Sequence, residues 1–148
     1  MMEDDKKQEF FLPITYQLTT NISTEEFIDI LVRSRLGERR PVDDLECIES
    51  MIENADIIVT AVMDDKIVGV ARAVTDYSYC CYLSDLAVDV SFQSHGIGKM
   101  LIRKVREQLG SKCKVILLSA PAAIEYYPKI GFTQHPSAWV MDSTKEIV

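Results

Sequence analysis

The sequence has no apolar run approaching the ~20 residues that a transmembrane helix requires. Its first nine residues are mostly charged or polar and contain no apolar signal core. We therefore expect a cytoplasmic protein that neither spans nor binds a membrane. We interpret residues 1–12 as a tail and residues 13–148 as a single domain, because 148 residues with 47% hydrophobic content suit one core.

Patterns that bind metal ions are also missing. The four cysteines include no C-x-x-C pair, and no histidine lies at ligand spacing from any of them. The usual zinc motifs are therefore absent from the sequence. We expect no metal cofactor, and we expect reduced thiols that pack as small apolar side chains.

An excess of basic charge is missing as well. The formal net charge of −7 argues against a nucleic-acid partner, which normally meets a basic face. The exception is the segment 96–114, where six basic residues stand against one acid, Glu107. Such a segment is either a solvated helix face or a surface that meets a polyanionic ligand, and the sequence leaves both open.

The first part of the chain predicts a strand followed by a helical hairpin. Ile14–Leu18 alternates apolar and polar residues, as a half-buried strand does. Ser23 and Glu26 have the spacing of a capping box, which starts a helix. Asp43 or Asp44 caps a second helix. We expect this hairpin to shape an acceptor site, because the sheet can form without it.

Three β-prone runs then predict an antiparallel meander, and a βαβ unit follows. The runs are Ile57–Val62, Ile67–Val74 and Tyr79–Val88. Gly69, inside the second run, predicts a bulge or a close approach by another backbone. The apolar run Lys114–Ser119 predicts a central strand parallel to a neighbour, and short final strands are expected at 132–133 and 139–141. This order predicts an α/β fold with a mixed, mostly antiparallel central sheet flanked by helices.

The third run leads into a glycine-containing loop and an amphipathic helix. Gly96 and Gly98 leave the helix N-terminus without bulky side chains in front of its free N–H groups, a setting that binds anions. The phosphate loop of NTPases does not fit, since position 93 is glutamine and Met100 follows Lys99. The dinucleotide fingerprint does not fit either, because Leu101 stands where its third glycine is required. We infer a pyrophosphate site of another class.

Two motifs indicate that class. Gln93-x-x-Gly96-x-Gly98 resembles the [RQ]-x-x-G-x-[GA] signature of the GNAT superfamily of acetyl-CoA-dependent N-acetyltransferases, although Val90 stands where proline is frequent in that family. The run Ala123–Phe132 is similar to the family's A-x-x-F-Y-x-K-x-G-F. Both motifs lie at the expected separation and on the expected order of elements. The resemblance extends over residues 14–141 and implies the GNAT fold.

The resemblance also implies which residues bind acetyl-CoA, the co-substrate. The backbone of the loop would bind the pyrophosphate, and the preceding strand, near Ser119, would bind the acetyl carbonyl and the pantetheine amides. The implied loop residues are Gln93, Ser94, His95, Gly96, Ile97, Gly98 and Lys99, and the strand residues are Leu86, Ala87 and Val88 with Ser119 on the parallel neighbour. Tyr127 is the implied general acid for the leaving thiolate, because a phenol with an ordinary pKa near ~10 stays protonated. Ordinary packing of this tyrosine on the sheet is the alternative.

A base for the incoming amine has no motif. Asp85 is the best single candidate because it precedes the acetyl site on its strand, and a structural, hydrogen-bonded carboxylate is the alternative. Ser84 and Tyr79 could instead relay a proton through water, so that no single base is needed.

The sequence thus predicts an enzyme that moves an acetyl group from acetyl-CoA to a small-molecule or peptide amine by direct attack in a ternary complex. The alternative is a non-catalytic acyl-CoA sensor or a partner-binding module on the same fold. The acidic composition mildly favours a cationic acceptor. A homodimer stays open, since dimers are common in the superfamily.

Overall fold

The computed structural model describes residues 13–148, so the predicted tail at 1–12 lies outside the described residues. The chain divides into two compact units, of which the first ends at Leu118 and the second comprises residues 119–148. Among residues 13–148, no helix combines the length and the apolar character that a bilayer crossing needs.

A five-stranded sheet forms the centre of the first unit. Its strands lie in chain order, and the first four are antiparallel, while the fifth is parallel to the fourth. They are β1 (Thr15–Leu18), β2 (Ile57–Met63), β3 (Lys66–Thr75), β4 (Cys80–Val88) and β5 (Lys114–Ile116). The predicted fold class, a mixed and mostly antiparallel sheet flanked by helices, is confirmed.

The helical hairpin forms as its caps predict. In α2 (Thr24–Arg33), the Ser23 hydroxyl accepts from the backbone N–H of Glu26, and the Glu26 carboxylate accepts from the N–H of Ser23. A short 3-10 helix, η1 (Leu36–Arg39), follows. Asp44, rather than Asp43, caps α3 (Leu45–Glu53) through the N–H of Cys47.

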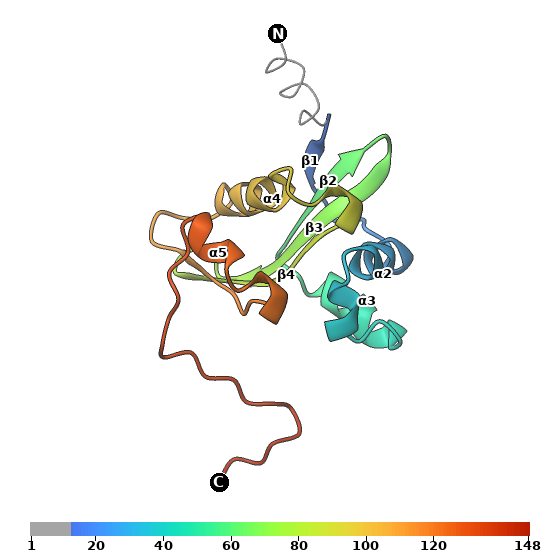
Figure 1. Ribbon diagram of the computed structural model, residues 1–148. Coiled ribbons are helices and arrows are strands. Elements are labelled where there is room, and N and C mark those ends of the chain that lie inside the picture. The colour runs from blue at the N-terminus through green and yellow to red at the C-terminus, as the bar shows by residue number, and fades with distance from the viewer. Residues whose placement is uncertain (1–12) are drawn as a thin grey trace. The chain divides into compact units, whose positions relative to one another are not determined.

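The hairpin and the long helix α4 (Ile97–Arg106) pack on opposite faces of the sheet (Figure 1). Phe27 of α2 and Ile48 of α3 share one buried cluster with Val70 of β3. The neighbouring Gly69 faces the other way, and a Cβ there would lie 3.1 Å from Leu101 of α4 and 3.2 Å from the carbonyl oxygen of Ala87. The predicted close approach at Gly69 is therefore confirmed, and the β2–β3 register also shifts beside it, between Ala61 and Val62.

Two predictions about the end of the chain are wrong. The strand predicted at Lys114–Ser119 covers only Lys114–Ile116, and it is the outer strand of the described sheet rather than a central one. Ile116 is 49% exposed, so this run has one covered face rather than two. The final strands predicted at 132–133 and 139–141 do not form, because no described residue after Ile116 pairs in a ladder.

Candidate functional site

The loop between β4 and α4 is fixed at its entry by Asp89. The N–H of Asp89 donates to the carbonyl oxygen of Val68 at 2.9 Å, and its Oδ1 accepts from the N–H of Ser91 at 2.8 Å, which starts the 3-10 turn η2 (Val90–Phe92). Its other oxygen, Oδ2, accepts from Arg33 Nη1 at 2.6 Å. Asp89 is buried, and each of its carboxylate oxygens therefore has a fixed donor.

These contacts determine the protonation of Asp89. Burial by itself would raise the pKa of this carboxyl group, but the hydrogen bonds from the Ser91 N–H and from Arg33 outweigh burial and lower the pKa below its ordinary value. The carboxylate therefore stays charged and keeps the entry of the loop closed against β3.

The loop then turns sharply and ends at an uncapped helix. Ser94 and Gly96 both have positive φ, at 69° and 79°, and the side chain of Gln93 donates to the carbonyl oxygen of Val88 at 3.1 Å. Gly96 is the N-cap of α4. Among the described residues, no side chain caps the first turn and no atom lies within 4 Å of a Cβ placed at this position. A helix start whose N–H groups have no capping side chain is an arrangement that favours an anion.

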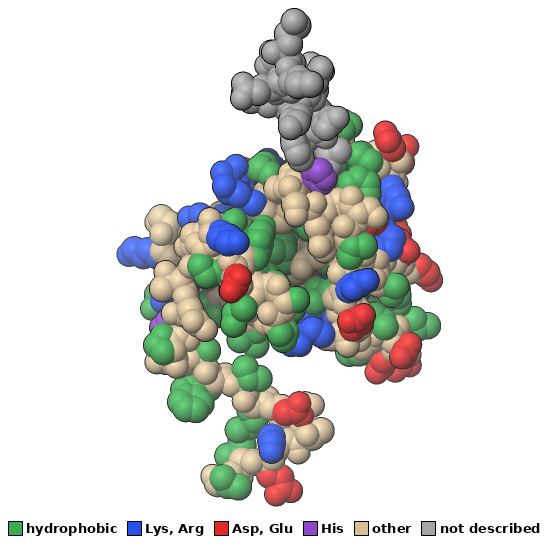
Figure 2. Space-filling view, viewed as in Figure 1, with side chains coloured by type: hydrophobic (Ala, Val, Ile, Leu, Met, Phe, Trp, Pro, Cys, Tyr) green, Lys and Arg blue, Asp and Glu red, His purple; other side chains and the backbone are tan. Residues whose placement is uncertain are grey.

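The basic side chains of α4 (Ile97–Arg106) fall into two groups. Lys99 lies exposed in the first turn of α4, whereas Arg103, Lys104 and Arg106 lie in its last turn. Figure 2 shows basic side chains over the α4 part of the face in view. Cations in the last turn complement the helix dipole, and Lys104 also pairs with Glu107 at 3.4 Å. Among the basic side chains of α4, Lys99 is the one placed to meet an anion at the helix start. The three in the last turn match the other predicted role, a solvated helix face.

The strand that precedes the loop has an open edge. On one side Leu86, Ala87 and Val88 pair with β3. On the other side the ladder to β5 stops at Tyr82, so in the part of the chain that the structure describes no strand pairs with this edge beyond that residue. On that side the backbone of Leu86–Val88 therefore has no ladder partner among the described residues, and the strand leads into the loop before the α4 N-terminus. The structure brings these residues and Gln93–Lys99 together in the first unit.

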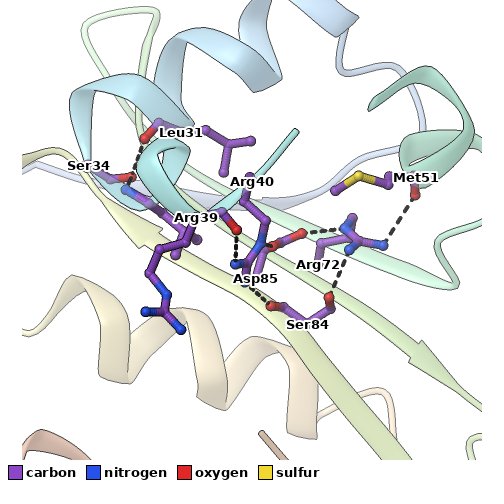
Figure 3. A network of polar contacts seen from close by, with 9 residues as sticks. Leu31, Ser34, Arg39, Arg40, Met51, Arg72, Ser84 and Asp85 are labelled. Atoms are coloured by element: carbon purple, nitrogen blue, oxygen red, sulfur yellow. Dashed lines mark hydrogen bonds and ion pairs between the residues drawn. The ribbon is translucent and has the colours of Figure 1, made fainter. Parts of the chain in front are cut away.

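A bulge in β4 lies directly before that edge. Arg72 pairs with Asp85 and Ala73 pairs with Leu83, so Ser84 is an extra residue with no partner on β3. Its groups are bound by two arginines instead. Arg40 Nη2 donates to the Ser84 carbonyl oxygen at 2.7 Å, and Arg72 Nη2 donates to the Ser84 hydroxyl at 2.9 Å (Figure 3).

The same two arginines hold Asp85, which has no exposed surface. Arg40 Nε donates to Oδ1 and Arg72 Nε donates to Oδ2, both at 2.5 Å. Each carboxylate oxygen of Asp85 is thus held in an ion pair. Of the two interpretations of Asp85, this geometry matches the structural carboxylate.

Sequence reasoning did not identify Arg40 or Arg72. One signal was present, because Arg72 is a single charged residue inside the apolar strand run Ile67–Val74, and a buried charge requires a partner. No comparable signal marks Arg40, which lies in a charged turn among other arginines.

Ser119 and Tyr127 belong to the second unit. There the chain forms the two short helices η3 (Pro121–Ala123) and α5 (Tyr126–Lys129). The ring of Tyr127 lies edge-on to those of Tyr126 and Phe132, at centroid distances of 5.2 and 5.4 Å. Burial, and to a smaller extent Tyr126, raises the pKa of the Tyr127 phenol, which keeps it protonated.

Curated relatives give the chain a family context. It is 28% identical over 98 residues to an uncharacterized N-acetyltransferase, ycf52, of Pyropia yezoensis, covering 62% of this chain and 56% of the relative. It is 31% identical over 100 residues to the chloroplastic GCN5-related N-acetyltransferase 1 of Arabidopsis thaliana, covering 65% of this chain and 51% of the relative. The chain thus spans about half the length of the curated relatives it matches.

Solved structures share the fold at low identity. A probable acetyltransferase of Staphylococcus aureus superposes with a TM-score of 0.71 at 19% identity, covering 87% of this chain and 97% of that one. The aminoglycoside N-acetyltransferase AAC(6')-Iy, solved in complex with CoA, superposes with a TM-score of 0.68 at 18% identity, covering 91% and 100%. The model of the acetyltransferase (GNAT) family matches residues 21–132. The chain therefore belongs to the GNAT family of acetyltransferases.

Proposed function

We propose that this protein transfers an acetyl group from acetyl-CoA to an amine by direct attack in a ternary complex. The observation that carries the proposal is the uncapped start of α4 at Gly96 beside the open edge of β4 at Leu86–Val88. The helix start offers N–H groups to a pyrophosphate, and the strand edge offers backbone groups to a pantetheine arm. Family membership and a structural neighbour solved with CoA support this assignment.

The reaction needs three things from the chain. The amine nitrogen attacks the thioester carbonyl and loses a proton, and the carbon–sulfur bond breaks to release the thiol. Backbone N–H groups of Leu86–Val88 would stabilise the oxyanion that develops during attack. The phenol of Tyr127 would give its proton to the leaving sulfur, a role that its protonated state suits.

Deprotonation of the amine is assigned to water rather than to one side chain. Both carboxylate oxygens of Asp85 are engaged by guanidinium groups, and the side chain has no exposed surface at which to meet an amine. Tyr79, by contrast, is exposed, and Ser84 lies at the bulge of β4. Water held near these residues would carry the proton to bulk solvent, and the free amine fraction would then set the rate at neutral pH.

Two measurements on the full chain test the proposal. Calorimetric titration measures the affinity for acetyl-CoA, and release of free thiol from acetyl-CoA in the presence of an amine panel measures transfer. Micromolar binding together with amine-dependent thiol release is the expected result. Binding without thiol release for any amine would favour the sensor, and absence of binding would remove the cofactor assignment. The cytoplasmic location and a homodimer stay predictions, and one relative is named chloroplastic.

A further inference from the structure

We propose that the acceptor amine carries a second, acidic group, a carboxylate or a phosphate, and that Arg40 binds it at the bulge of β4. The inference rests on the proposed acetyl transfer and names the chemical class of its acceptor. It runs against the overall acidic composition, which by itself mildly favours a cationic acceptor.

The charges around the bulge do not balance. Arg40 and Arg72 share one carboxylate, that of Asp85, so the cluster of these three side chains has a formal charge of +1. In the described part of the chain no second acid contacts either arginine. The side chain of Arg72 is 8% exposed and that of Asp85 is fully buried, so these two alone would form a closed ion pair.

Arg40 is the more exposed of the two arginines, so the excess charge of the cluster is accessible at Arg40. Its side chain is only 22% exposed and shares its counter-ion, Asp85, with Arg72, and a partly buried positive charge without full compensation is unfavourable. Three carbonyl or carboxylate oxygens accept from it, those of Asp85, Arg39 and Ser84. A guanidinium has five N–H donors in a planar fork, so two remain, and a fork of this kind suits carboxylate and phosphate oxygens.

The backbone around Arg40 is held in an uncommon conformation. Arg35, which precedes η1, has φ of 70°, a left-handed value that non-glycine residues seldom adopt. The short helix that follows places the Arg40 side chain against β4, whereas the Arg39 side chain points away from the network (Figure 3). Such conformations concentrate where a site requires them.

The position of Arg40 relative to the acetyl site sets the size of the acceptor. Arg40 binds the carbonyl oxygen of Ser84, which lies two residues before Leu86 on β4. Two residues of a strand span about 7 Å. An acidic group at Arg40 and an amine at the open edge of β4 would thus be separated by the length of a short chain or a sugar ring. Two pairs of amines test this distance. In 4-aminobutyrate and in glucosamine 6-phosphate the amine and the acidic group are about this far apart, and butylamine and glucosamine are their counterparts without the acidic group.

The test compares kcat/KM within each pair, with thiol release as the readout. In the natural protein we expect the acidic member to be preferred by at least about tenfold, as a charge-assisted hydrogen bond allows. Arg40→Gln should reduce this ratio to about one. Arg39→Gln removes the same charge from the adjacent residue and should leave the ratio unchanged. Because a ratio does not depend on the fraction of folded protein, a loss of stability alone cannot mimic the result.

Three outcomes would overturn the inference. They are preference for the uncharged member of both pairs, absence of turnover with every acidic member, and equal ratios in Arg40→Gln and Arg39→Gln. The two pairs also separate a carboxylate from a phosphate as the preferred group. Calorimetric binding of acetyl-CoA in the same samples distinguishes this failure from failure of the proposed function, since the cofactor assignment would survive it.

Discussion

Arg33 Nη1 lies 2.6 Å from Oδ2 of Asp89, and this ion pair joins the last turn of α2 to the first residue after β4. The same guanidinium donates to the carbonyl oxygen of Ile67 at 2.5 Å and to Asp29 at 2.8 Å. Helix α2 belongs to the hairpin assigned to the acceptor, whereas Asp89 opens the loop assigned to acetyl-CoA. One side chain therefore links the two halves of the proposed site within the first unit.

We expect Arg33→Gln to weaken acetyl-CoA binding by about tenfold, because loss of a partly buried, charge-assisted contact leaves the entry of the loop less ordered. Calorimetric titration measures the change in Kd. Asp29→Asn is the matched control, since Asp29 is 62% exposed and its pair with Arg33 contributes little. Equal affinities in the two variants would show that Arg33 does not position the loop.

Asp89 makes the stability of the protein depend on pH in acid. Because the pKa of this carboxyl group is lowered in the folded chain, its contribution to stability is present above the unfolded-state pKa of about 4 and is lost as pH falls through the folded-state pKa. Asp89→Asn should therefore be less stable than the natural protein at pH 7, and the difference should shrink below about pH 4. Urea unfolding at several pH values measures it, and a difference that is constant with pH would contradict the assignment.

Gly96 tests the role of the α4 N-terminus. Asn tolerates a positive φ, and a Cβ at this position meets no atom of the described residues within 4 Å, so Gly96→Asn should keep the melting temperature close to its natural value. The same side chain would block the N–H groups of the first turn, and we expect acetyl-CoA affinity to fall by more than tenfold. Gly96→Val should do the same and also lose about 1–2 kcal/mol of stability. Unchanged affinity in the Asn variant would move the pyrophosphate elsewhere.

Local patterns predicted the elements that local contacts determine. The capping box of Ser23 and Glu26 closes within four residues, and the glycine loop at Gly96 follows directly from the strand before it. The close approach at Gly69 could be predicted because a glycine inside a strand often marks a place where another backbone packs closely. In the capping box and the glycine loop, the signal and its partner lie within a short segment. At Gly69 the glycine alone is the signal, and its neighbours Ala87 and Leu101 lie far along the chain.

Contacts between distant residues could not be predicted in this way. Arg40 and Asp85 are 45 residues apart, and nothing in the charged turn at Arg40 identifies its partner. The strand predicted at 139–141 fails for a related reason. Trp139 and its neighbours have β-prone side chains, but a strand needs a ladder partner, and β propensity does not reveal whether one is present.

The two interpretations of Asp85 predict different results for Asp85→Asn. If Asp85 is a structural carboxylate, its replacement by Asn leaves Arg40 and Arg72 without a buried counter-ion. The free energy of unfolding should then fall by about 3–5 kcal/mol. Glu107→Gln is the control, since its exposed pair with Lys104 should contribute under about 1 kcal/mol. If Asp85→Asn unfolds at the same urea concentration as the natural protein but has a much lower kcat, Asp85 is the base instead.

Tyr127 and its neighbour form a matched pair for the chemistry. Tyr127→Phe removes only the hydroxyl group, and we expect kcat to fall by about 10²-fold with little change in KM for acetyl-CoA, the pattern of a lost general acid. Tyr126→Phe makes the same chemical change on the adjacent residue of α5 and should leave kcat within about threefold. If the two variants are equally active, neither phenol takes part in the reaction.

The pH dependence of the natural enzyme gives a second test of Tyr127. Its pKa is raised above the ordinary value of about 10, so the phenol stays protonated and able to donate throughout the neutral and weakly basic range. Activity should therefore rise with pH as the acceptor amine loses its proton, and it should not decline below about pH 10 on account of this residue. In Tyr127→Phe the rising limb should stay in place while the plateau drops, because the amine still titrates but the leaving thiolate is no longer protonated by the enzyme. A shift of the rising limb itself would assign Tyr127 to deprotonation of the amine rather than to departure of the thiol.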